Sequence, residues 1–184
     1  YNNLDEKEFK NLNNFYWFFS LDLKSSKEKV QQVISNWIND NSKYNHKSWD
    51  FDVTAKRIIA WLSCHNLTYD ESNEDYRNNF NKLILKQTNH LINEVKRSKI
   101  IEDKLIGCAS IILVGLCYHD EKKYLSFGSS LLKKISKTMS LTFGSWLAKT
   151  PKLKPANLSR RRRQKLAWNF CSFYTESASI PSRR

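Results

Sequence analysis

The residues best suited to chemistry in this chain lie between Trp49 and Leu62, where two tryptophans, an aspartate and an arginine share one short segment. Arg57 and Trp61 are four residues apart, so on a helix their side chains share one face. There the guanidinium could lie over the indole in a cation–π contact, or both groups could line a groove for a polar ligand. A structural interpretation, with Arg57 extended over a packed Trp61, stands beside this binding interpretation.

Apolar spacing predicts the elements that must position these residues. Ala55, Ile58, Ile59 and Leu62 follow the i, i+3, i+4, i+7 rule of a helix with one buried stripe. Similar patterns recur to about residue 140, and strand-like alternation is nearly absent. We expect an aromatic segment over 9–21 and helices over about 27–41, 50–64, 73–96, 98–118 and 121–139, the third beginning with a capping box from Ser72 to Asp75.

Short polar turns between these helices favour antiparallel neighbours, as in bundles, solenoids or α/α toroids. No sequence repeat is apparent, which argues against a solenoid. The body is therefore predicted to be all-α. The longest apolar run, over 105–118, is too short to cross a bilayer, so we expect no membrane span.

The net charge of +13 is concentrated near the C-terminus. Residues 145–184 contain ten Lys or Arg and a single acidic residue, Glu176, together with all three prolines. Arg160, Arg161, Arg162 and Arg163 stand close to aromatic residues, a pattern that can hold phosphates and stack bases. A nucleic-acid-binding tail on a non-enzymatic helical module is therefore one functional hypothesis. The nearly balanced body predicts no basic helical face for such a ligand.

Metal and disulfide chemistry have little support in the sequence. The four cysteines lack metal-ligand spacing, and we expect them to be buried free thiols. His46, His65 and His119 have no second ligand at helical spacing, and no phosphate-binding loop is present. We expect no metal and no cofactor.

One ordered set of motifs resembles a known family. Trp37-Ile38, Trp49-Asp50, Arg57, Trp61-Leu62 and then Asn89-His90-Leu91 are similar to the helical domain of heparinase II/III-like polysaccharide lyases. The resemblance spans about 14–132. It implies antiparallel helices that form part of an incomplete α/α toroid, and a parent protein with a C-terminal β-sandwich domain that is missing here.

The resemblance also implies a function and a site. The family cleaves uronic-acid-containing polysaccharides, glycosaminoglycans among them, by β-elimination, which makes the parent protein a carbon–oxygen lyase. Asn89 matches the asparagine that binds the uronate carboxylate, and His90 follows it; both would be catalytic. Arg57, Trp49 and Trp61 would bind the substrate, an acidic polysaccharide, since aromatic faces suit sugar rings and Arg suits uronate or sulfate.

The resemblance ends near residue 141, where the family's Asp-Gly segment and catalytic tyrosine have no match. We therefore divide the chain into a helical domain over 1–140 and an irregular basic tail over 141–184, whose different composition is consistent with a shifted reading frame or a fusion. Tyr1 in place of Met indicates a truncated start. As it stands the chain is expected to be a catalytically incomplete fragment, and the sequence does not choose between bacterial cytoplasm and periplasm.

Overall fold

A computed structural model describes residues 4–21, 25–118 and 120–149 of the chain. These ranges contain helices and no strand, so the predicted all-α class is confirmed. None of the described helices is long and apolar enough to cross a membrane. In chain order the elements are α1 (Glu6–Asn13), the 3₁₀ helix η1 (Tyr16–Ser20), α2 (Lys27–Asn41), α3 (Phe51–Ser63), α4 (His65–Thr68), α5 (Glu74–Arg97), α6 (Ile101–Cys117) and α7 (Lys122–Lys149).

The chain divides into two compact units between Ile135 and Ser136, a few residues before the predicted boundary at 140. The first unit contains α1 to α6, η1 and the beginning of α7. The remainder of α7 belongs to the second unit. Since α7 continues to Lys149, the prediction of an irregular chain from residue 141 onward is wrong for 141–149.

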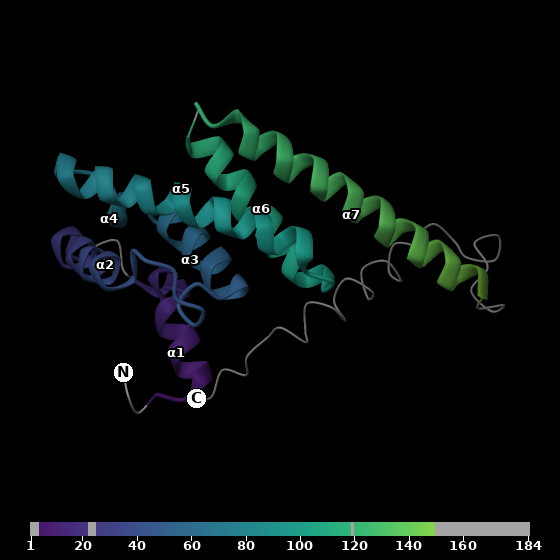
Figure 1. Cartoon of the computed structure of the whole chain (residues 1–184), viewed down its shortest axis with the longest axis horizontal. Coiled ribbons are helices and arrows are strands. Elements are labelled where there is room, and N and C mark those ends of the chain that lie inside the picture. The colour runs from purple at the N-terminus through teal and green to yellow at the C-terminus, as the bar shows by residue number, and fades with distance from the viewer. Residues whose placement is uncertain (1–3, 22–24, 119, 150–184) are drawn as a thin grey trace. The chain divides into compact units, whose positions relative to one another are not determined.

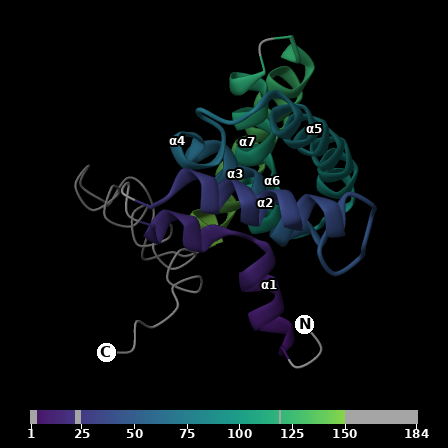
Figure 2. The same ribbon diagram turned by 90° about the vertical axis from the view of Figure 1, so that its left-hand side faces the viewer.

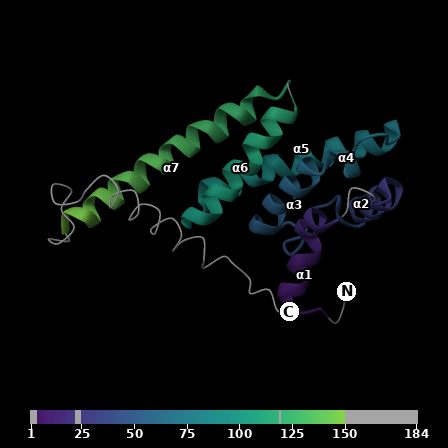
Figure 3. The ribbon, with the colours of Figure 1, turned by 180° about the vertical axis from the view of Figure 1, so that it is seen from behind.

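Helix α3 forms the centre of the first unit, where it packs against α5 and α6 on one side and against α1, η1 and α4 on others (Figures 1 and 3). Its residues Val53, Ala55, Ile58 and Ala60 have no exposed surface. A helix surrounded in this way buries nearly its whole circumference. Of the predicted stripe, Ala55 and Ile58 are buried, whereas Ile59 and Leu62 are only half-buried, so the stripe accounts for a part of what α3 buries.

Aromatic rings join α2 and η1 to α3. Trp37 of α2 and Phe15 meet Trp61 edge to face, with centroids 5.6 and 5.2 Å from the Trp61 ring. Phe15 adopts a left-handed backbone with φ 56°, which costs a non-glycine residue about 1–3 kcal/mol. Burial of its ring in this cluster offsets that cost. Helix α2 then packs against α4 and α5 (Figure 2).

The predicted helices begin within a few residues of the observed starts, but one of the capping residues differs from the prediction. Ser26 caps α2 and Asp50 caps α3 through their side-chain oxygens. The predicted capping box at Ser72 is wrong, because Asn73 caps α5 while the Ser72 hydroxyl donates to the Tyr69 carbonyl. The segment over 9–21 is divided by a break between α1 and η1, and the one-turn helix α4 was not expected.

Gly115 allows α6 and the beginning of α7 to approach closely. A Cβ atom at this position would lie 2.8 Å from the Cα of Leu125 and would also meet its backbone nitrogen. Backbone atoms cannot rotate away as a flexible side chain can. This glycine is therefore required by the turn between α6 and α7.

We predict that Gly115→Ala destabilises the chain, although alanine favours a helix by about 1 kcal/mol over glycine. Overpacking costs about 1–3 kcal/mol, and contact with backbone atoms that cannot move aside puts this position at the upper end, so after the gain of about 1 kcal/mol the net loss in the free energy of unfolding should be about 2 kcal/mol. Urea unfolding followed by circular dichroism measures it. Ser126→Ala, at an exposed position on α7, is the matched control and should change stability by less than about 0.5 kcal/mol. A more stable Gly115→Ala variant would contradict the proposed contact.

Candidate functional site

Arg57 lies in the core of the first unit with no exposed surface. Its guanidinium donates to the carbonyl oxygens of Asn13 and Ser48 at 2.8 and 3.0 Å, and to the side chains of Gln87 and Thr54 at 3.2 and 3.3 Å. All four partners are neutral. Loss of hydration lowers the pKa of Arg57 to about 9, so the group stays charged at neutral pH.

The indole that Arg57 contacts is not the expected one. The guanidinium carbon lies 4.0 Å from the ring centre of Trp37, whereas Trp61 stacks on Phe80. Trp61, like Arg57, has no exposed surface. Both side chains therefore lie beneath the molecular surface, in agreement with the structural interpretation of this pair, and neither is exposed to a polymer in solution.

Trp49 and His90 form a second group together with Tyr44. Trp49 is buried, and its indole N–H donates to the Asn41 carbonyl at 2.9 Å. His90 Nε2 lies 3.3 Å from the Trp49 carbonyl oxygen, and since a carbonyl only accepts, Nε2 must carry the proton. In the neutral imidazole the lone pair is then on Nδ1. Tyr44, 63 % exposed, packs against both rings and covers this group.

Asn89 is exposed on α5, and its orientation is fixed by a tyrosine from α7. The Tyr124 hydroxyl donates to Asn89 Oδ1 at 3.0 Å. The amide oxygen is thereby occupied, and the Nδ2 group has no acceptor among the described residues. Burial raises the pKa of Tyr124, so this phenol stays a donor at neutral pH.

Asn89 belongs to a row of exposed side chains along α5. Members of this row, the donor stripe, are spaced by three or four residues and therefore share one face of the helix: Lys82, Lys86, Asn89, Asn93 and Lys96. No carboxylate interrupts the row, which extends over about 21 Å at 1.5 Å per residue. Lys86 also lies 5.5 Å from the centre of the Trp49 ring.

The donor stripe contradicts the expectation that the body has no basic helical face. Its spacing was readable in the sequence, opposite the buried stripe of Phe80, Ile84 and Leu91. Tyr44 gave no such signal, because only the fold brings it beside His90. Together, ammonium and amide donors next to an exposed ring can bind a polymer that carries both carboxylates and sugar faces.

Within the described residues, the other predicted features form no part of this site. Among the residues that the structure describes, no three His, Cys, Asp or Glu side chains lie close enough to hold a metal ion. Cys64, Cys108 and Cys117 are free thiols, but Cys117 is exposed, which corrects its predicted burial. The arginines over 160–163, their aromatic neighbours and Cys171 lie outside the described residues, as does His119.

Comparison with models of protein families, with curated proteins and with solved structures finds no match to this chain.

We predict that Arg57→Met unfolds at much lower urea concentration than the wild type. Loss of the guanidinium leaves buried oxygens on Asn13, Ser48 and Gln87 without donors, at about 1–3 kcal/mol for each oxygen that water does not reach. We expect a total loss of at least about 3 kcal/mol. Arg97→Met, at an exposed arginine of α5, is the matched control and should be nearly neutral. Equal stabilities would show that Arg57 has no structural role.

A second prediction concerns pH. Because the folded state raises the pKa of Tyr124 above its unfolded value of about 10, the resulting stabilisation is fully present below pH 10 and is lost as the pH rises toward the folded pKa. Tyr124→Phe removes this term, so its stability should fall less steeply than that of the wild type between about pH 9 and 11. Urea midpoints at several pH values measure the slope. Identical slopes would contradict a buried, protonated Tyr124.

Proposed function

We propose that this chain is the helical part of a heparinase II/III-like polysaccharide lyase, with a partial α/α toroid as its architecture, and that it binds an acidic polysaccharide along α5. One observation carries the proposal: the donor stripe presents Asn89 with its amide oxygen occupied by Tyr124 and its N–H donors directed elsewhere. An amide fixed in this way can donate to a carboxylate but does not offer it a competing acceptor.

The flanking groups match the other features of such a polymer. Lys86 and Lys82 supply positive charge within one or two helical turns of Asn89, and the exposed ring of Tyr44 offers an apolar face for a sugar. Arg57 and Trp49 take a different role from the one expected of them. Arg57 binds the Ser48 carbonyl in the loop before α3, and Trp49 in the same loop contacts Tyr44 and His90. The two residues thereby fix the positions of Tyr44 and His90.

β-Elimination makes three demands on these groups. Hydrogen bonding to the uronate carboxylate acidifies the C5 proton, a base removes that proton, and the C4–O bond breaks as a C4=C5 double bond forms. The departing oxygen takes up a proton and becomes a hydroxyl group. Asn89 is assigned to the carboxylate, and His90, with its lone pair on Nδ1, is assigned to proton transfer.

Two protons move in this reaction, one from C5 and one to the departing oxygen, and His90 is assigned to a single transfer. The other transfer requires a group outside this site. Tyr124 is close to Asn89, but its raised pKa keeps the phenol protonated at neutral pH, so it does not serve as the base. We therefore treat Tyr124 as a positioning residue. A complementary β-sandwich domain would supply the missing catalytic groups, as the family resemblance implies. The hypothesis of a nucleic-acid-binding tail has no described residue in its favour.

We predict that the chain binds polygalacturonate, a uronate polymer without sulfate, and that Asn89→Ala and Lys86→Ala each weaken binding about tenfold. Hydrogen bonds to charged groups contribute about 1.5–3 kcal/mol, and a factor of ten corresponds to about 1.4 kcal/mol. Isothermal titration at fixed salt gives the affinity. Lys7→Ala removes the same charge from α1, outside the donor stripe, and should bind like the wild type.

Two further measurements separate the hypotheses. A chain that ends at Lys149 should retain polygalacturonate binding that depends on Asn89. If truncation abolishes all binding and Asn89→Ala changes nothing, the polymer contacts the basic tail, and the proposed site is wrong. Single-stranded RNA tests the alternative directly, since tail-mediated binding would be strongly salt-dependent and would vanish in the truncated chain.

A further inference from the structure

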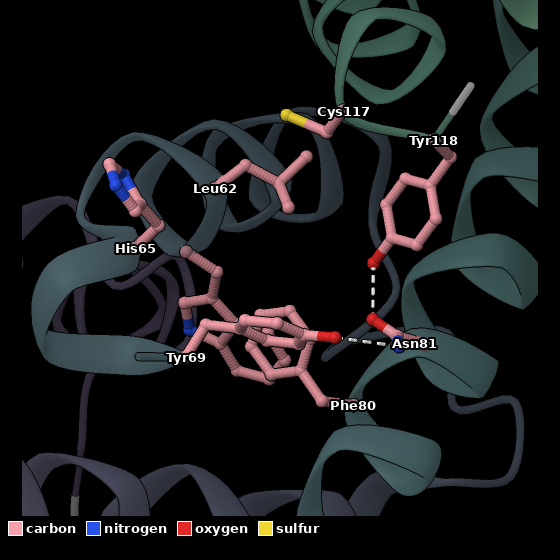
Figure 4. A pocket seen from close by; sticks show the side chains of 8 residues that line it. Leu62, His65, Tyr69, Phe80, Asn81, Cys117 and Tyr118 are labelled. Atoms are coloured by element: carbon pink, nitrogen blue, oxygen red, sulfur yellow. Dashed lines mark hydrogen bonds between the residues drawn. The ribbon is translucent and has the colours of Figure 1, made fainter. Parts of the chain in front are cut away.

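A cavity of about 360 Å³ lies among α3, α4, α5 and the end of α6, within the first unit (Figure 4). Its volume is within the range of about 300–1,000 Å³ that small-molecule sites occupy. Aromatic and aliphatic side chains make up most of the wall, and none of the lining residues belongs to the donor stripe: Trp61, Leu62, His65, Tyr69, Phe80, Asn81, Cys117 and Tyr118.

Polar groups at one end of the cavity form a relay with a fixed direction. The Tyr118 hydroxyl donates to Asn81 Oδ1 at 2.7 Å, and Asn81 Nδ2 donates to the Tyr69 hydroxyl oxygen at 3.0 Å (Figure 4). Tyr69 thus receives a hydrogen bond and keeps its own proton to donate. No acceptor for that proton occurs among the described residues. The end of the relay is therefore a free O–H donor.

Trp61 carries an indole N–H that has no hydrogen-bond partner in the described part of the chain and almost no accessible surface, so a ligand in the cavity does not reach it. A buried N–H without an acceptor costs about 1–3 kcal/mol, so such groups are uncommon in folded proteins. Trp61 also stacks with Phe80, and both rings line the cavity. The wall thus combines flat aromatic surface with one free donor, the Tyr69 hydroxyl.

Charge limits the ligand further. Lysine, arginine, aspartate and glutamate are absent from the lining residues. A charged ligand would lose hydration here without gaining an ionic partner. The cavity does not suit a uronate and so differs from the site on α5. Although Cys117 is exposed as a residue, partial loss of hydration raises the pKa of its thiol, which makes it a weak nucleophile and favours binding over covalent chemistry.

From this arrangement we infer a second binding site, which takes a neutral aromatic compound bearing a carbonyl oxygen. The ring system lies against the aromatic side chains of the cavity wall, and the carbonyl accepts from the Tyr69 hydroxyl. This inference does not depend on the proposed lyase function, because the two sites share no residue.

Coumarin is the probe that tests this site, and 2H-chromene, which has the same fused rings without the carbonyl, is its matched control. Isothermal titration of the full chain should give a Kd of about 1 mM or tighter for coumarin, a modest value for a ligand of about eleven heavy atoms. Chromene should bind about 3–10-fold more weakly, since one neutral hydrogen bond contributes that factor. Equal affinities would overturn the role of the Tyr69 hydroxyl as donor.

Two variants locate the site. Cys117→Trp places a large side chain in the cavity wall and should weaken coumarin binding at least tenfold, whereas Leu116→Trp adds the same group at the exposed neighbouring position and should leave it unchanged. Circular dichroism checks that both variants fold. In the wild type, saturating coumarin should also slow alkylation of Cys117 severalfold, as followed by peptide mass spectrometry. Absence of saturable binding, or binding that neither protects Cys117 nor responds to Cys117→Trp, would overturn the inference.

Discussion

A single buried charge constrains the first unit of this chain more than any other interaction. Removing a guanidinium from water costs several kcal/mol unless polar partners replace the lost hydration. Arg57 meets this demand with two backbone carbonyls, two side-chain oxygens and the face of Trp37. The carbonyls come from the end of α1 and from the loop before α3, and one side chain comes from α5. The charge is satisfied only when these separate segments are in their native positions.

The candidate site depends on the same constraint. The Ser48 carbonyl that Arg57 binds is next to Trp49, whose own carbonyl accepts from His90 and whose ring packs under Tyr44. Gln87, another partner of Arg57, lies on α5 between Lys86 and Asn89 in sequence and faces the core while they face solvent. Arg57 therefore fixes the donor stripe and the aromatic cover relative to each other without touching a ligand.

Sequence patterns predicted α2, α3, α5 and α6 well because each has a strong local signal, whereas α1 and the one-turn α4 were missed. The predicted range of about 27–41 agrees with the observed bounds of α2. Ser26 caps this helix, and Val30, Ile34 and Trp37 repeat at helical spacing. Local sequence patterns could not predict the burial of Arg57. Its partners lie as far as 44 residues away, and local spacing with Trp61 pointed to a ring that Arg57 does not use. Asn89 was singled out by its motif and stays a prediction, but the phenol that orients it comes from another helix and could not be foreseen.

The hydrogen exchange of the Arg57 side chain tests this account most directly. In a uniformly ¹⁵N-labelled chain at neutral pH, the Nε–H of Arg57 should give a resolved signal that exchanges with water as slowly as the backbone amides of α3, because it is buried and donates to Gln87. Arg97, whose side chain is 78 % exposed, provides the fast-exchanging reference in the same spectrum. If Arg57 exchanged as rapidly as Arg97, the guanidinium would be in contact with solvent, and its proposed role as the centre of the fold would be wrong.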